Sequence, residues 1–263
     1  MVDATLLNWT LNQFLVMVMI MIRVGPLLFL MPITGSRNVP SQVKILLTAA
    51  TALVLLPVVP VQAEQMPATF SGFLIFVVSE VAFAAILAVF TRLIFDAVQI
   101  AGQMVGIQMG MGMAGVLDPQ FGNQTSLIGQ LWNLIAILIF LAVDGHHLYI
   151  KTLHVSFIWV APGTLHIGQA TFEGLMQGTS LMFVMSVKIM APASAAVFFS
   201  HIAMGIIAKT VPQIPILIVG MPINIGVGFI FVGLSLVYFL PLMIGQFEML
   251  GRLLPRLAQG LGG

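Results

Sequence analysis

Charged side chains that could do chemistry are few in this sequence, and four of them interrupt long apolar runs. Arg23, Glu80, Arg92 and Lys188 each lie inside a hydrophobic segment. A charge at the centre of a bilayer costs at least about 2.5–3.5 kcal/mol on insertion scales. We therefore expect these side chains to face a protein interior, an interface with partner subunits or a wet cavity.

A polar stripe follows one face of the predicted helix that contains Arg92. At 100° per residue, its members fall within about 60° of one another: Arg92, Asp96, Gln99 and Gln103. The stripe could line an aqueous path or form a polar contact with partner subunits. The alternative is ordinary helix packing, in which Arg92 and Asp96 pair with each other. Glu80 lies off this stripe and needs a separate partner, for which Lys188 is a candidate.

Glycine and methionine alternate in the segment that follows this helix. Each interior glycine costs a helix about 1 kcal/mol relative to alanine, and methionine is unbranched and adaptable. The segment is therefore deformable and apolar, which suits a gate or plug that seals a pore. The alternative is close helix packing through the small residues Gly102, Gly106 and Gly110.

Asp144, His146 and His147 form a short polar run after an apolar segment. The two histidines are adjacent, so on a helix they point in different directions and cannot form a metal-binding pair four residues apart. With Asp144 they could form a proton site, but a polar helix end at the membrane interface is the favoured interpretation. We expect no metal, no cofactor and no catalytic residue.

Composition excludes most other classes of protein. Nine basic and eight acidic residues in 263 make 6% charged, 60% are hydrophobic and cysteine is absent. This excludes a soluble globule, a disordered chain, a disulfide framework and, at net charge +1, a basic nucleic-acid-binding face. Nucleotide-binding and hydrolase motifs are missing.

Hydropathy predicts about six apolar segments, of which only 126–143 and 223–240 are uninterrupted spans. The segment 45–56 is too short to span, since Pro57 ends it. Breaks are expected at Pro26 and Pro192, and Pro222 belongs to the predicted loop before the last span. A further break is expected after the span that ends at 143. Composition and these breaks predict a membrane-associated helical protein.

A series of different short motifs lies along the chain in a specific order, from about residue 11 to residue 240. They comprise 22–26, the turn with Arg37 and Pro40, then Lys44, Glu80, 101–103, 108–110, Asp118 with Pro119, Asp144 and His146 within 144–147, 156–157, Pro212 and Gln213 within 211–214, and 220–222. In order and spacing they resemble the flagellar biosynthetic protein FliR family. The related injectisome export proteins share the pattern, and the run 144–147 favours a flagellar member.

The resemblance implies an all-α subunit whose kinked hairpins pack in a hetero-oligomeric protein export gate. One such subunit joins several copies of FliP and FliQ, with FlhB and possibly FlhA and the basal-body ring nearby. Residues 1–160 would be FliP-like, including a plug loop at 106–122, and 161–263 would form a FliQ-like hairpin part. The implied plug residues are Gly106, Met109, Gly110, Met111, Gly112, Met113, Val116 and Leu117.

The resemblance also implies a place and a substrate. The place is the bacterial inner membrane at the flagellar basal body, in contact with lipid. The substrates are unfolded flagellar subunits, with no nucleic acid involved. Two alternatives from other classes stay open: a small-molecule secondary transporter with broken helices, and, less favoured, a membrane-embedded hydrolase.

Overall fold

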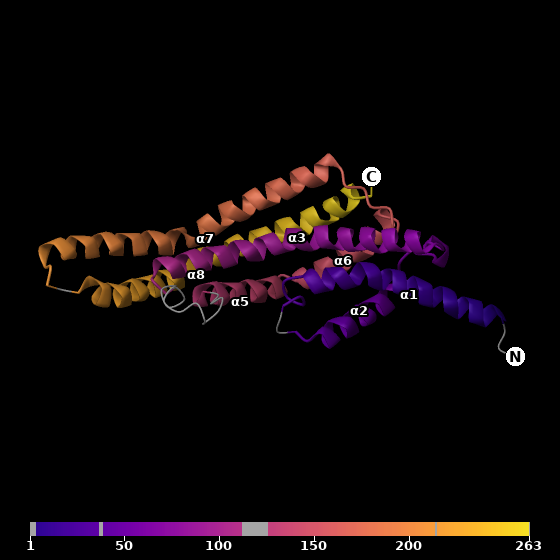
Figure 1. The fold of residues 1–263 in the computed structure, drawn as a ribbon, viewed down its shortest axis with the longest axis horizontal. Coiled ribbons are helices and arrows are strands. Elements are labelled where there is room, and N and C mark those ends of the chain that lie inside the picture. The colour runs from indigo at the N-terminus through magenta and orange to yellow at the C-terminus, as the bar shows by residue number, and fades with distance from the viewer. Residues whose placement is uncertain (1–3, 37–38, 112–125, 214, 263) are drawn as a thin grey trace. The chain divides into compact units, whose positions relative to one another are not determined.

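Helices make up nearly all of the described chain, which contains no strand. The computed structural model describes residues 4–36, 39–111, 126–213 and 215–262. Its elements are α1 (Ala4–Leu30), α2 (Ser41–Leu55), the short 3-10 helix η1 (Ala63–Gln65), α3 (Phe70–Gln108), α5 (Leu127–Ala142), α6 (Gly145–Trp159), α7 (Gln169–Thr210) and α8 (Ile216–Gly260) (Figure 1). The all-α prediction is confirmed.

Four described helices are long and apolar enough to cross a membrane: α1, α3, α7 and α8. The pair α5 and α6 passes the same test only as one broken span. The helix α2 has 15 residues and reaches about 22 Å, short of the roughly 30 Å hydrocarbon core. The shortness of this segment and the break after residue 143 were both expected from the sequence.

Prolines interrupt the helices less than the sequence predicts. Pro26 lies inside α1 and Pro192 inside α7, and α8 begins at Ile216, before Pro222. A proline removes one backbone hydrogen bond. In an apolar setting, leaving the helix would expose several more backbone groups that have no water to bond. The expected breaks at Pro26 and Pro192 were therefore wrong.

The chain divides into two compact units. Unit 1 comprises Met1–Arg92, Asp144–Gly178 and Glu248–Gly263. Its core is built from α1, α2, the first half of α3, α6 and the last turns of α8. Those last turns bury Leu250, Leu254 and Ala258 at four-residue spacing, which places one face of the helix end in the core.

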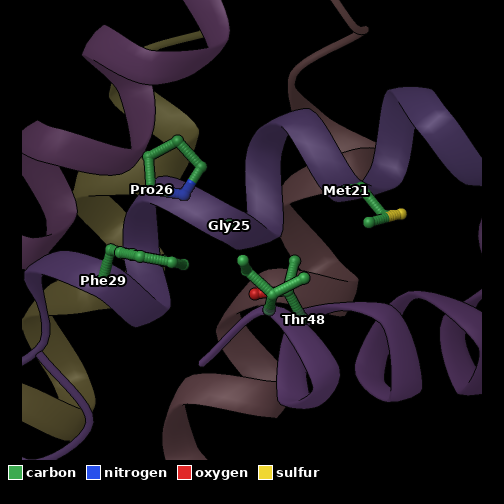
Figure 2. A pocket seen from close by; sticks show the side chains of 6 residues that line it. Met21, Gly25, Pro26, Phe29 and Thr48 are labelled. Carbon is green, nitrogen blue, oxygen red and sulfur yellow. The ribbon is translucent and has the colours of Figure 1, made fainter. Parts of the chain in front are cut away.

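An apolar cavity of about 310 Å³ opens between α1 and α2 in unit 1 (Figure 2). A Cβ on Gly25 would lie in ordinary van der Waals contact with Thr48 Cγ2, at 3.5 Å. The hydroxyl of Thr48 donates to the Lys44 carbonyl oxygen of its own helix at 2.8 Å. The cavity therefore offers no free polar group to a substrate. Its lining is Met21, Gly25, Pro26, Phe29, Ile45 and Thr48.

Unit 2 comprises Leu93–Val143 and Thr179–Phe247. Phe95, Phe140 and Phe247 form an aromatic cluster with ring centroids 5.2–5.9 Å apart. The end of α7 and the start of α8 form a hairpin (Figure 1), in which the Ser200 hydroxyl donates to the Asn224 side chain at 2.7 Å. The predicted division at residue 160 concerns likeness to FliP and FliQ, and it stays a prediction.

Candidate functional sites: a buried ion pair and a capped helix end

Arg23 and Glu80 form a bidentate ion pair inside unit 1. Arg23 Nε donates to Glu80 Oε2 at 2.5 Å, and Nη2 donates to Oε1 at 2.9 Å. The two residues are only 1% and 2% exposed. This planar pairing matches the guanidinium fork to the carboxylate. Two of the four charges within apolar runs therefore neutralise each other away from lipid.

Two aromatic rings and two backbone carbonyl oxygens also contact the Arg23 guanidinium. Its Cζ lies 4.7 Å from the centroid of the Phe83 ring and 4.4 Å from that of Phe157. Its Nη1 donates to the carbonyl oxygens of Ser156 and Val160 at 3.1 and 3.0 Å. These contacts join α1 to α3 and to the C-terminal end of α6, where the Ser156 carbonyl oxygen also accepts from the N–H of Val160.

Glu80 holds the chain that leaves α6. Its Oε1 accepts a hydrogen bond from the backbone N–H of Gly163 at 2.7 Å. The Glu80 carboxylate and the Arg23 guanidinium thus have hydrogen-bond partners in a site closed to solvent, as a stable buried pair requires. We interpret the site as a structural junction of unit 1 rather than a place where substrate or protons bind.

Gly163 supplies a testable consequence of this junction. Its φ is +81°, and a Cβ there would lie 2.9 Å from Phe76 Cδ2. We expect Gly163→Ala to lower the free energy of unfolding of the detergent-solubilised chain by about 1–2 kcal/mol for the left-handed backbone alone, with the clash adding to it. Gly168→Ala is the matched control, because no atom lies within 4 Å of its Cβ. Equal stability of the two variants would contradict this assignment.

The other polar candidates lie elsewhere. The partner of Glu80 is Arg23 and not Lys188, which is exposed on α7. Arg92, Asp96 and Gln103 are exposed on α3, and Gln99 is half-buried. Exposed polar side chains on an apolar helix suit an interface or an aqueous path, and those roles stay predictions.

The small residues near the end of α3 pack against the start of α5 within unit 2. A Cβ on Gly102 would lie 2.3 Å from the Cα of Gly129, and one on Gly106 would lie 2.3 Å from Ser126 Oγ. The Ser126 hydroxyl donates to the Gly102 carbonyl oxygen at 3.0 Å. Gly102 and Gly106 thus serve close helix packing, one of the two interpretations that the sequence left open.

Gly110 ends α3. Its φ is +83°, its N–H bonds to the Ile107 carbonyl oxygen at 3.0 Å, and the N–H of Met111 bonds to the Gly106 carbonyl oxygen at 3.0 Å. This pair of hydrogen bonds around a left-handed glycine is the Schellman motif of helix termini. The chain therefore leaves the helix at Met111, within the predicted plug segment.

The described methionines of the predicted plug differ in burial on the two sides of Gly110. Met109 is fully buried against Gly228 of α8, where an added Cβ would lie 2.5 Å from Met109 Cγ. Met111 is half-buried. Met109 is thus a core side chain in this state of unit 2. Gly112, Met113, Val116 and Leu117 lie outside the described residues, as do Asp118 and Pro119.

The remaining motif residues occupy helix starts and loops. Pro40 precedes α2, and Lys44 Nζ donates to the Ser36 carbonyl oxygen at 3.0 Å. Asp144 precedes α6 with a left-handed φ of 56°, and His146 follows in its first turn. Pro212 and Gln213 are exposed between α7 and α8, and Arg37 lies outside the described residues.

Sequence reasoning did not single out Phe83 and Gly163 as parts of the Arg23 site. Phe83 lies three residues after Glu80, on the same face of α3, so the helical spacing was an available signal. Gly163 carried no comparable signal, because its role depends on a loop that returns to a helix far earlier in the sequence.

Comparison with known proteins gives a consistent result. The family described as "Bacterial export proteins, family 1" matches residues 14–250. The chain is 29% identical to the flagellar biosynthetic protein FliR of Bacillus subtilis, over 85% of this chain and 87% of the relative. It is 28% identical to FliR of Escherichia coli over 79% of both chains. It is 27% identical to FliR of Aquifex aeolicus, over 86% and 88%.

Proposed function

Because the chain belongs to the bacterial export proteins, family 1, we propose that it is a structural channel subunit of the flagellar type III protein export gate. It is a flagellar export component with four helices able to cross a membrane. In this proposal one copy joins several copies of FliP and FliQ in the inner membrane at the basal body, with FlhB and FlhA as neighbours. The observation that carries it is the family match from residue 14 to residue 250.

The chain's part in the channel is to contribute a plug. The Schellman cap at Gly110 ends α3, and α5 begins at Leu127. The end of α3 within the predicted plug segment supports this part of the proposal. The packing of Gly102 and Gly106 against the start of α5 holds the two flanks of that segment together.

The chemistry of the plug suits a channel that must pass polypeptide and retain ions. An ion that enters a constriction lined by methionine and glycine loses water and gains no polar partner, which is costly. An unfolded chain can displace flexible thioether side chains and slide past them. The plug supplies a seal and no driving force, and we assign the energy source to other components of the apparatus.

A secretion assay in the bacterium that carries the chain tests the proposal. Deletion of the gene is expected to abolish secretion of flagellar subunits and motility, and the gene supplied in trans is expected to restore both. Membrane potential and general protein secretion serve as controls, because a structural export subunit should leave them intact. Normal flagellar assembly in the deletion strain would overturn the proposal.

A further inference from the structure

Three potential metal ligands gather at the start of α6. Asp144, His146 and His147 each offer one ligand atom, and these atoms all lie within 4.8 Å of one another. The two histidines are adjacent in the sequence, so they do not share one helical face. Asp144, however, precedes the helix with a φ of 56°, and this left-handed turn brings its carboxylate back over the first turn.

The details of the cluster resemble a set of ligands more than a polar helix end. His147 Nδ1 lies 3.1 Å from Asp144 Oδ1, and the centroids of the two imidazole rings lie 4.1 Å apart. Two ligands about 2.0–2.1 Å from a tetrahedral ion lie about 3.4 Å from each other. The Asp144–His147 separation is therefore close to that of two ligands that share one ion.

His146 provides a second, independent observation. Its Nδ1 is shielded from solvent and has no hydrogen-bond partner among the described residues. A shielded ring nitrogen without a partner is unfavourable, and a metal ion beside it would supply that partner. Asp144 and His147 have side chains that are 71% and 67% exposed, so both can rotate to close the remaining gap.

We propose that Asp144 Oδ1, His146 Nδ1 and His147 Nδ1 bind one divalent transition-metal ion. The ion takes the place of the hydrogen between Asp144 and His147, and the neutral imidazole of His147 then carries its proton on Nε2. Imidazole nitrogen with one carboxylate oxygen suits Zn²⁺, Ni²⁺ or Cu²⁺. Water completes the coordination on the exposed side. The carboxylate also offsets the positive end of the α6 dipole, which disfavours a cation.

Zinc titration of the full-length chain tests this site. The chain is purified in detergent through an affinity tag without histidine, stripped with chelator, and titrated with Zn²⁺ by calorimetry. We expect one equivalent to bind with a saturable isotherm. Co²⁺ in place of Zn²⁺ is expected to give the visible absorption of a four-coordinate site.

Variants locate the binding. His146→Gln and His147→Gln are each expected to weaken zinc binding by more than about tenfold, and Asp144→Asn is expected to weaken it as well. His201→Gln, an exposed histidine on α7, is the matched control and should bind as the unmodified chain does. Circular dichroism checks that each variant keeps its helices.

Two outcomes would overturn the site. One is the absence of saturable zinc binding to the unmodified chain. The other is binding that survives in His146→Gln and His147→Gln, or that falls equally in His201→Gln, since this would indicate scattered surface histidines. Neither outcome bears on the secretion assay, so the proposed export function can stand or fall separately.

Discussion

Replacing Glu80 with Leu is expected to lower the free energy of unfolding of the chain by about 3–5 kcal/mol, the largest stability effect that we predict. The substitution leaves the Arg23 guanidinium, which is 1% exposed, without its counterion. It also removes the acceptor of the Gly163 N–H. Unfolding of the detergent-solubilised chain with SDS, followed by circular dichroism, measures the change.

A double-mutant cycle separates the ion pair from the packing. Arg23→Met alone is expected to cost a similar amount, because it leaves the Glu80 carboxylate buried with only the Gly163 N–H. The double variant Arg23→Met/Glu80→Leu should cost less than the sum of the two single variants, since neither charge remains. Strict additivity, or a Glu80→Leu effect within about 0.5 kcal/mol of zero, would contradict the assignment of this pair as the junction of unit 1.

Replacing Met111 and Met113 together with glycine is expected to raise the ion leak of the assembled export complex severalfold. Both residues follow Gly110 in the sequence, so they belong to the segment that we assign to the plug. Loss of their apolar side chains lowers the cost for a hydrated ion in the constriction. Conductance of the complex in a planar bilayer measures the leak.

Met109 provides the contrasting variant. Because Met109 is fully buried against Gly228, Met109→Ala is expected to destabilise the chain by about 2–5 kcal/mol. Any leak that it causes should therefore accompany loss of assembly. Unchanged conductance in the Met111→Gly/Met113→Gly complex, with assembly verified by size-exclusion chromatography, would contradict the plug assignment.

The sequence allowed the helical class and the charge placement to be predicted, but not the pairing of the charges. A charge within an apolar run needs shielding. Arg23 and Glu80 are shielded by burial, whereas Arg92 and Lys188 are exposed on their helices and their shielding stays a prediction. The contact between Arg23 and Glu80 joins residues 57 positions apart. A single sequence does not show which residues of two helices so far apart in the chain lie opposite each other. On charge alone, Lys188 was an equally acceptable partner for Glu80.

Helix boundaries near glycine and proline were the less predictable part of the fold. In the Gly–Met segment several glycines were equivalent candidates for a helix end, and only the backbone shows that Gly110 has the left-handed conformation. The prolines at 26 and 192 are strong break signals in water, yet the apolar surroundings keep both helices continuous. Whether a proline ends a helix depends on whether water or apolar groups surround it. The sequence alone does not show those surroundings directly.

The mass of the complex that copurifies with the chain tests the central claim most directly. The complex is extracted with mild detergent from the membranes of the bacterium that carries it and weighed by native mass spectrometry. We expect one copy of this chain bound to several copies each of FliP and FliQ. A monomer or a symmetric homo-oligomer of this chain alone, as a secondary transporter would form, would contradict it.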